Sequence, residues 1–142
     1  MPRYVVDASI VAKWVLPGEP YEEQSVRLKE DSVGGVVELH APSLLPYEVG
    51  NLLWRATRLK RIEKGEARSA LEALATLRIT LHDVNWLFVT ECLELSSALD
   101  LSVYDTGYIF LSSMLKAPLV TADKQLVVKA RTEARALHIK DY

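Results

Sequence analysis

The sequence alternates short apolar, β-branched runs with longer segments of helical periodicity, and no hairpin signal such as Asn-Gly joins two runs. The strand-like runs fall at residues 3–6, 38–41, 79–83, 118–121 and 137–140. The helical segments fall at 9–16, 21–31, 44–60, 64–77, 86–99, 103–116 and 123–135. Strands connected through helices pair in parallel, and helices then cover both faces of the sheet. The pattern predicts an α/β fold with a mainly parallel sheet. Segment 103–116 is apolar on nearly every face, which predicts a buried helix.

Length and composition limit the classes of protein that fit. The 142 residues match one domain, and we assign residues 1–142 to it. The net charge of −2 excludes the strongly basic field of a protein that coats nucleic acid, so a polyanion site must be local. The single cysteine, Cys92, excludes an internal disulfide, indicates a reducing compartment and is expected to be buried. With no signal peptide and no apolar run of ~20 residues, we expect a cytoplasmic protein that does not span a membrane.

Four acidic residues are candidates for a functional site, and each also has a local explanation. Asp7 and Asp123 follow strand-like runs and can cap the helices that come next. Asp105 fits a capping box that begins at Ser102. Glu48 lies in the first turn of its helix, where an acid complements the helix dipole, but it also lies beside the apolar stripe. Taken singly, none of the four requires a catalytic role.

The four acids together predict a cation site. Asp7 and Asp123 stand at the carboxyl ends of parallel strands, where open α/β sheets bind ligands. Two helices then contribute Glu48 and Asp105. Clustered carboxylates repel one another unless a divalent cation neutralises them, and ligands that are all oxygen favour Mg²⁺ or Mn²⁺ over zinc.

The segments that carry these acids resemble the PIN-domain nucleases, and in particular the VapC-type ribonuclease toxins of prokaryotic toxin–antitoxin pairs. The resemblance covers VVDASIVAKWVLPGE, APSLLPYEVGNLLWRATRLKRI and SVYDTGYIFLSSMLKAPLVTADKQL, and so extends over the chain. It implies that Asp7, Glu48, Asp105 and Asp123 are the metal-binding acids. It also implies a five-stranded parallel sheet in a three-layer α/β/α fold, and a small polar residue near the metal, which Ser9 or Thr121 can supply.

The resemblance implies a metal-dependent endoribonuclease that acts on RNA, with a VapB-type antitoxin as partner and a homodimer or higher oligomer as assembly. Under this hypothesis Asp7, Asp105 and Asp123 hold Mg²⁺ or Mn²⁺, and Glu48 completes the pocket or orients the attacking water. Two alternatives stay open. One is a non-catalytic RNA-binding module with the same pocket. The other is a Mg²⁺-dependent phosphohydrolase that forms an aspartyl phosphate, which usually has a second acid where this chain has Ser9.

Outside the acids, one basic run is a candidate RNA contact. It comprises Arg55, Arg58, Lys60, Arg61, Lys64 and Arg68, of which we select Arg55, Arg58 and Arg61 as substrate-binding residues. The alternative is a solvated helix end, where cations suit the dipole.

The aromatic residues and histidines are expected to be structural. Trp14, Trp54 and Trp86 lie at helical spacing among apolar residues, which favours packing in the core or at an interface over stacking on bases. The histidines lie in or beside strand-like runs without ligand spacing; they are His40, His82 and His138. The helix from Leu44, with Leu53 and Trp54, is a candidate wall of an antitoxin groove.

Overall fold

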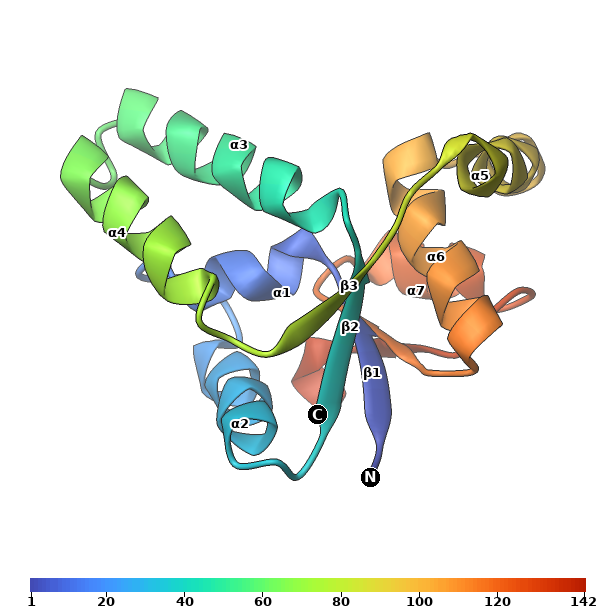
Figure 1. Ribbon diagram of the computed structural model, residues 1–142, viewed down its shortest axis with the longest axis horizontal. Coiled ribbons are helices and arrows are strands. Elements are labelled where there is room, and N and C mark those ends of the chain that lie inside the picture. The colour runs from blue at the N-terminus through green and yellow to red at the C-terminus, as the bar shows by residue number, and fades with distance from the viewer.

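All five predicted strands form, and they pair in parallel in the order β3-β2-β1-β4-β5 (Figure 1). The computed structural model describes residues 1–142. The strands are β1 Arg3–Val6, β2 Glu38–Pro42, β3 Ile79–His82, β4 Leu119–Thr121 and β5 Ala136–His138. The helices are α1 Ala8–Lys13, α2 Glu22–Val33, α3 Leu45–Arg58, α4 Lys64–Leu74, α5 Trp86–Leu99, α6 Val103–Leu115 and α7 Lys124–Ala130, followed by the 3₁₀ turn η1 Ile139–Asp141.

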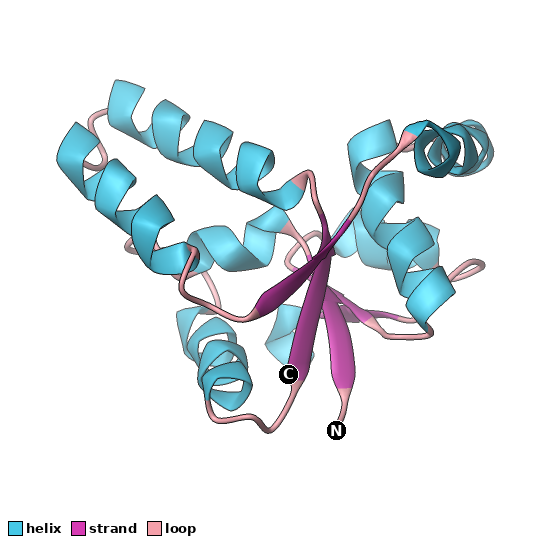
Figure 2. Cartoon of the chain, viewed as in Figure 1, coloured by secondary structure: helices cyan, strands magenta, loops and turns pink.

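The sheet lies between two groups of helices, as the sequence pattern predicts. Helices α1 to α4 lie on one side, and α5 and α6 lie on the other (Figures 1 and 2). The core is one apolar cluster to which the central strands contribute fully buried residues, including Val5, Val6 and Leu119. From β1 the chain proceeds to β2 on one side of the sheet, and it later returns to β4 on the other side of β1. The order of the chain therefore reverses between β1 and β4, which is where ligands bind in sheets of this type.

Several predicted boundaries are wrong by a few residues. Helix α4 ends at Leu74 instead of residue 77, and α7 ends at Ala130 instead of residue 135. The chain must leave α7 early because Arg135 accepts a sheet hydrogen bond from the backbone amide of Leu119. Helix α1 ends at Lys13 instead of residue 16, because residues 14–18 form the turns that lead towards α2. The last strand ends at His138, and η1 replaces the rest of the predicted strand.

Helix α6 is buried only in its middle. Residues from Thr106 to Ile109 are buried because α6 packs on the sheet and on α5, but Tyr104 and Met114 are exposed. The prediction that this helix is buried on every face is therefore wrong at its ends. Cys92 of α5 is buried, as expected, and burial raises the pKa of its thiol.

The three tryptophans have different environments. The indole nitrogen of Trp14 donates a hydrogen bond to the carbonyl oxygen of Ser25, and its ring is partly buried. Trp54 and Trp86 are 54% and 90% exposed, so the prediction of core packing is wrong for both, and only interface packing remains open to them. Both lie on outer helix faces, which sequence periodicity alone did not distinguish from inner ones. Leu53 is buried in the core and so cannot form the wall of a groove.

The histidines make structural contacts, in agreement with the prediction. A ring nitrogen of His40 on β2 lies 2.9 Å from one of His82 on β3, which links the two strands. The Nε2 atom of His138 donates to the carbonyl oxygen of Ala122 at 3.0 Å. None of the helices is long and apolar enough to cross a lipid bilayer.

Candidate active site

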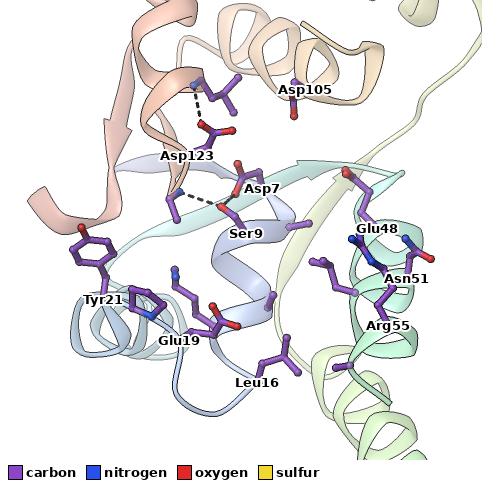
Figure 3. Close-up of a pocket in the computed structure, with 18 of the residues that line it drawn as sticks. Asp7, Ser9, Leu16, Glu19, Tyr21, Glu48, Asn51, Arg55, Asp105 and Asp123 are labelled. Atoms are coloured by element: carbon purple, nitrogen blue, oxygen red, sulfur yellow. Dashed lines mark hydrogen bonds between the residues drawn. The ribbon is translucent and has the colours of Figure 1, made fainter. Parts of the chain in front are cut away.

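Four carboxylates from separate parts of the chain line one pocket at the carboxyl edge of the sheet. Asp7 follows β1 and Asp123 follows β4, the two strands between which the chain order reverses. Glu48 and Asp105 come from the first turns of α3 and α6. Figure 3 shows all four side chains around the same hollow. The fold therefore places the four predicted acids in a shared site.

Asp7 is the most tightly held of the four. Its side chain is only 7% exposed. Its Oδ1 atom accepts hydrogen bonds from the Ser9 hydroxyl at 2.6 Å and from the backbone amide of Ile10 at 3.3 Å. Its Oδ2 atom accepts a hydrogen bond from the Thr121 hydroxyl. Both carboxylate oxygens are therefore acceptors, an arrangement that suits the ionised form of the side chain.

The two hydroxyls that hold Asp7 are oriented by the junction between β4 and α7. The Ser9 hydroxyl accepts from the backbone amide of Ala122 at 3.0 Å, and the Thr121 hydroxyl accepts from that of Asp123 at 3.1 Å. Each hydroxyl has one proton, and the accepted bond directs that proton toward Asp7. Ser9 and Thr121 thus fix both Asp7 and the start of α7, which carries the second strand-end acid.

The pocket carries negative charge without an opposing ion pair. Burial raises the pKa of Asp7 to about 6, while the Ser9 and Thr121 hydrogen bonds act in the opposite direction. Burial also raises the pKa of Glu48, against the bond that the Tyr108 hydroxyl donates to it at 2.7 Å. The pKa of Asp105 is raised by burial and then by the charge of Asp123. Lysine, arginine and histidine form salt bridges elsewhere in the chain but with none of these four acids.

The capping interpretation of these acids is also correct, in part. Asp7 caps α1 through Ile10, and Oδ1 of Asp123 accepts from the backbone amides of Gln125 and Leu126 at the start of α7. The Oδ2 atom of Asp123 makes no hydrogen bond. Ser102 caps α6 by accepting from the backbone amide of Asp105, but the Asp105 side chain does not accept from the backbone amide of Ser102, so the predicted capping box is only half formed. Capping therefore orients the carboxylates of Asp7 and Asp123, whereas the carboxylate of Asp105 caps no helix.

The donor set fits a hydrated divalent cation. No three of the His, Cys, Asp and Glu side chains lie close enough together to enclose an ion directly. The four carboxylates share the pocket without meeting at one point. Mg²⁺ is commonly bound by one or two carboxylates and keeps several of its water ligands. The uncompensated oxygen ligands and their spacing suit an ion that is held partly through water.

The predicted arginines divide between the pocket and the outer surface. Arg55 and Arg61 line the pocket, and Arg61 pairs with Glu19 at 3.1 Å. Arg58 does not line it, because its guanidinium lies over the Trp54 ring, 5.0 Å from the centroid. The structure therefore separates Arg58 from the other two arginines, and RNA contact by any of the three stays a prediction.

The sequence prediction missed several polar residues that line the pocket, namely Lys13, Glu19, Tyr21, Asn51 and Tyr108. Lys13 lies in the segment SIVAKWVL, whose apolar residues predict a buried helix and not part of a charged site. For Lys13, the sequence feature that could have indicated a place in the site is its spacing from Ser9. Lys13 follows Ser9 by four residues, which places the two side chains on the same face of a helix.

The chain matches the PIN domain family over residues 4–131. It belongs to that family. Ribonuclease VapC3 of Pyrobaculum aerophilum is 32% identical over 128 residues, which cover 89% of this chain and 94% of that protein. The structure of Mycobacterium tuberculosis VapC20, described as a sarcin-ricin loop cleaving toxin, matches with a TM-score of 0.71 and 16% identity, over 88% of this chain and 93% of that one. VapBC2 from Rickettsia felis, bound to a DNA fragment from its promoter, matches with a TM-score of 0.66 and 13% identity, over 96% and 98% of the two chains. At these identities the solved structures show a shared fold.

Thr121 should be important for the stability of this PIN domain. It is fully buried, and its hydroxyl joins Asp7 to the backbone amide of Asp123. Thr121→Val keeps the shape of the side chain but leaves a donor and an acceptor without partners. We expect the free energy of unfolding to fall by about 1–3 kcal/mol. Urea denaturation measures this change, and Thr121→Ser, which retains the hydroxyl, is the control. Equal losses in the two variants would assign the effect to packing instead of hydrogen bonding.

Proposed function

We propose that this PIN domain is a metal-dependent endoribonuclease and the toxin of a VapBC-type toxin–antitoxin pair, acting in the cytoplasm. The observation that carries the proposal is the pocket with four carboxylates and no opposing ion pair. Membership of the PIN-domain family and the similarity to a ribonuclease over most of both chains give further support. A non-catalytic RNA-binding module would have no use for four acids without cationic partners in one pocket, of which Asp7 is buried and costs stability when ionised.

Asp7, Asp105 and Asp123 are proposed to hold Mg²⁺ or Mn²⁺, with Glu48 beside them. When bound, the cation supplies Lewis-acid stabilisation of the phosphate oxygens and lowers the pKa of water. The chain supplies the positioning. Ser9 and Thr121 keep Asp7 ionised and directed into the pocket, and the cap on α7 leaves one oxygen of Asp123 unbonded.

Glu48 is proposed to orient the attacking water and accept its proton. Its Oε1 atom is held by the Tyr108 hydroxyl, which leaves Oε2 available to a water molecule in the pocket. Burial raises the pKa of Glu48, which makes it a better proton acceptor than an exposed glutamate. The attacking water needs no covalent enzyme intermediate, which separates this mechanism from the aspartyl-phosphate alternative.

A VapB-type antitoxin and a homodimer or higher oligomer are proposed as partners, as the family resemblance implies. The chain offers apolar surface for such contacts. An apolar hollow lies between α3, α4 and β3, lined by residues that include Leu71, Leu74 and Leu81. On another face, Trp86 and Leu87 at the start of α5 are 90% and 78% exposed. On both surfaces several apolar residues lie next to one another, and such patches are typical of protein–protein contacts.

The nuclease assignment is tested with the purified chain and labelled RNA. Single-stranded and structured RNAs are incubated with Mg²⁺, with Mn²⁺ and with EDTA, and products are separated on denaturing gels. We expect internal cleavage with either cation and no cleavage above background with EDTA. RNA binding without cleavage would favour the regulatory module. Release of inorganic phosphate from a small phosphoester, with intact RNA, would favour the phosphohydrolase.

A further inference from the structure

The side chain of Lys13 is mostly buried, but its ammonium reaches the solvent in the pocket and makes no ion pair or hydrogen bond with another residue. Its side chain is only 6% exposed, yet it lines the same pocket as the four acids. Its nearest recorded partner is the ring of Tyr21, whose centroid lies 5.9 Å from the ammonium. That distance is at the outer limit of a cation–π contact, so the ring holds the ammonium only weakly. The ammonium of Lys13 is therefore available to a ligand that enters the pocket.

Helix α1 runs from the part of the pocket that contains Asp7 to the part that contains Lys13. Asp7 caps its first turn, and Lys13 is its last residue. Six residues separate them, which corresponds to about 9 Å along a helix axis. Arg55 from α3 also lines the pocket and lies beside Glu48, whereas Glu19, which pairs with Arg61, lies at the end away from Asp105 and Asp123 (Figure 3). Lys13 therefore lines the pocket at a distance from Asp7, whereas Arg61 is already paired with Glu19.

A structural role at the helix terminus does not explain the burial of Lys13. A lysine in the last turn does complement the helix dipole. That effect is available to an exposed lysine, which would keep its ammonium hydrated. Lys13 instead buries its aliphatic stem and presents its ammonium to the pocket, and this position suits an anionic ligand.

We propose that Lys13, assisted by Arg55, binds a phosphate of the RNA next to the one that is cleaved. This inference rests on the proposed function, because it assigns a second subsite to the same pocket. An RNA that enters the pocket carries phosphates on both sides of the scissile one, and the chain has a net charge of −2. The acids can accept the scissile phosphate only through a cation. The neighbouring phosphate needs a cation from the protein, and Lys13 supplies one at a fixed place.

The test compares Lys13→Met, which removes the charge, with Lys13→Arg, which keeps it. Lys116→Gln is the matched control, since Lys116 is exposed and precedes β4, at the opposite edge of the sheet. We expect Lys13→Met to raise the KM for RNA about tenfold with little change in kcat, the result of losing an interaction made equally in ground state and transition state. Lys13→Arg should retain most of the affinity.

Salt dependence separates a phosphate contact from a general structural effect. Fluorescence anisotropy of labelled single-stranded RNA, at constant Mg²⁺ and in a Glu48→Gln background to prevent cleavage, gives Kd over a range of salt concentration. Loss of one phosphate contact should make the plot of log Kd against log salt shallower by about 0.7. Lys116→Gln should leave both KM and this slope near their wild-type values.

A folded Lys13→Met variant with wild-type KM and salt slope would overturn the inference. If that variant does not fold, lysine-selective NMR of the wild-type chain decides. Addition of RNA should then shift the side-chain signal of Lys13 but not that of Lys116, and an unmoved Lys13 signal overturns the inference. A salt slope that depends on Lys13 in a chain that never cleaves RNA would leave the subsite intact and remove the proposed nuclease function.

Discussion

Replacing Asp7 by asparagine is expected to abolish most RNA cleavage and, at the same time, to stabilise the metal-free protein. Asp7 is the buried member of the acidic pocket, and both of its oxygens are oriented by hydrogen bonds. Lewis-acid stabilisation by a bound ion is worth several kcal/mol, so loss of a principal ligand should lower kcat/KM by at least about a thousand-fold. Gel-based cleavage assays under saturating Mn²⁺ measure this loss.

The gain in stability follows from the burial of the charge. Burial raises the pKa of Asp7 from 3.8 to about 6. Each pKa unit corresponds to about 1.4 kcal/mol, so the ionised side chain costs the fold on the order of 3 kcal/mol near neutral pH. Asparagine is neutral but replaces only part of the hydrogen bonding. The lost hydrogen bonding offsets part of the charge effect, so we expect a net gain of about 1–2 kcal/mol in the free energy of unfolding.

The pH dependence of this gain provides an internal control. Because the pKa of Asp7 is higher in the folded state than in the unfolded state, folding favours the protonated side chain. This contribution to stability is complete below about pH 4 and is lost as the pH rises through about 6. The difference between Asp7→Asn and the wild-type chain should be largest at neutral pH and should close on acidification. A difference that does not vary with pH would show that the charge of Asp7 is not its cause.

Divalent cations are expected to stabilise the wild-type chain strongly. A ligand present at 100 times its Kd adds about 2.7 kcal/mol to the stability of the state that binds it. For a domain of this size that is a rise of roughly 10 °C in Tm. Asp7→Asn and Asp105→Asn should lose most of this shift, because each removes one of the pocket carboxylates. Thermal unfolding with Mg²⁺, with Mn²⁺ and with EDTA measures it.

Asp100→Asn is the matched control for the cation experiment. Asp100 is an exposed acid at the end of α5, its backbone φ of 53° suits asparagine, and it lies outside the pocket. This variant should keep the full cation-induced shift. The shift in the wild-type chain should also increase from about pH 5 to 7, since protons compete with the cation for raised-pKa carboxylates. An equal shift in all of the chains would place the cation outside the acidic pocket.

Much of the fold could be predicted from local patterns. The β-branched runs around Val5 and Val120 form central strands because such residues pack well in a sheet that is buried on both faces. The ends of elements were less accurate where a distant partner decides them. Helix α7 stops at Ala130 because Arg135 must reach the sheet beside Leu119, a requirement that residues 123–135 do not reveal by themselves.

The sequence by itself determined which side chains could form the site, since Asp7 and Asp123 had to follow strands and could cap the helices after them. Only the tertiary structure decided how they meet. The bond from Thr121 to Asp7 spans 114 positions in the chain, and that from Tyr108 to Glu48 spans 60. Tertiary packing also turned Lys13 into the pocket and Arg58 onto Trp54. The physical reason is that local patterns specify which face of an element is apolar, whereas the neighbours of a polar side chain depend on how separate elements pack.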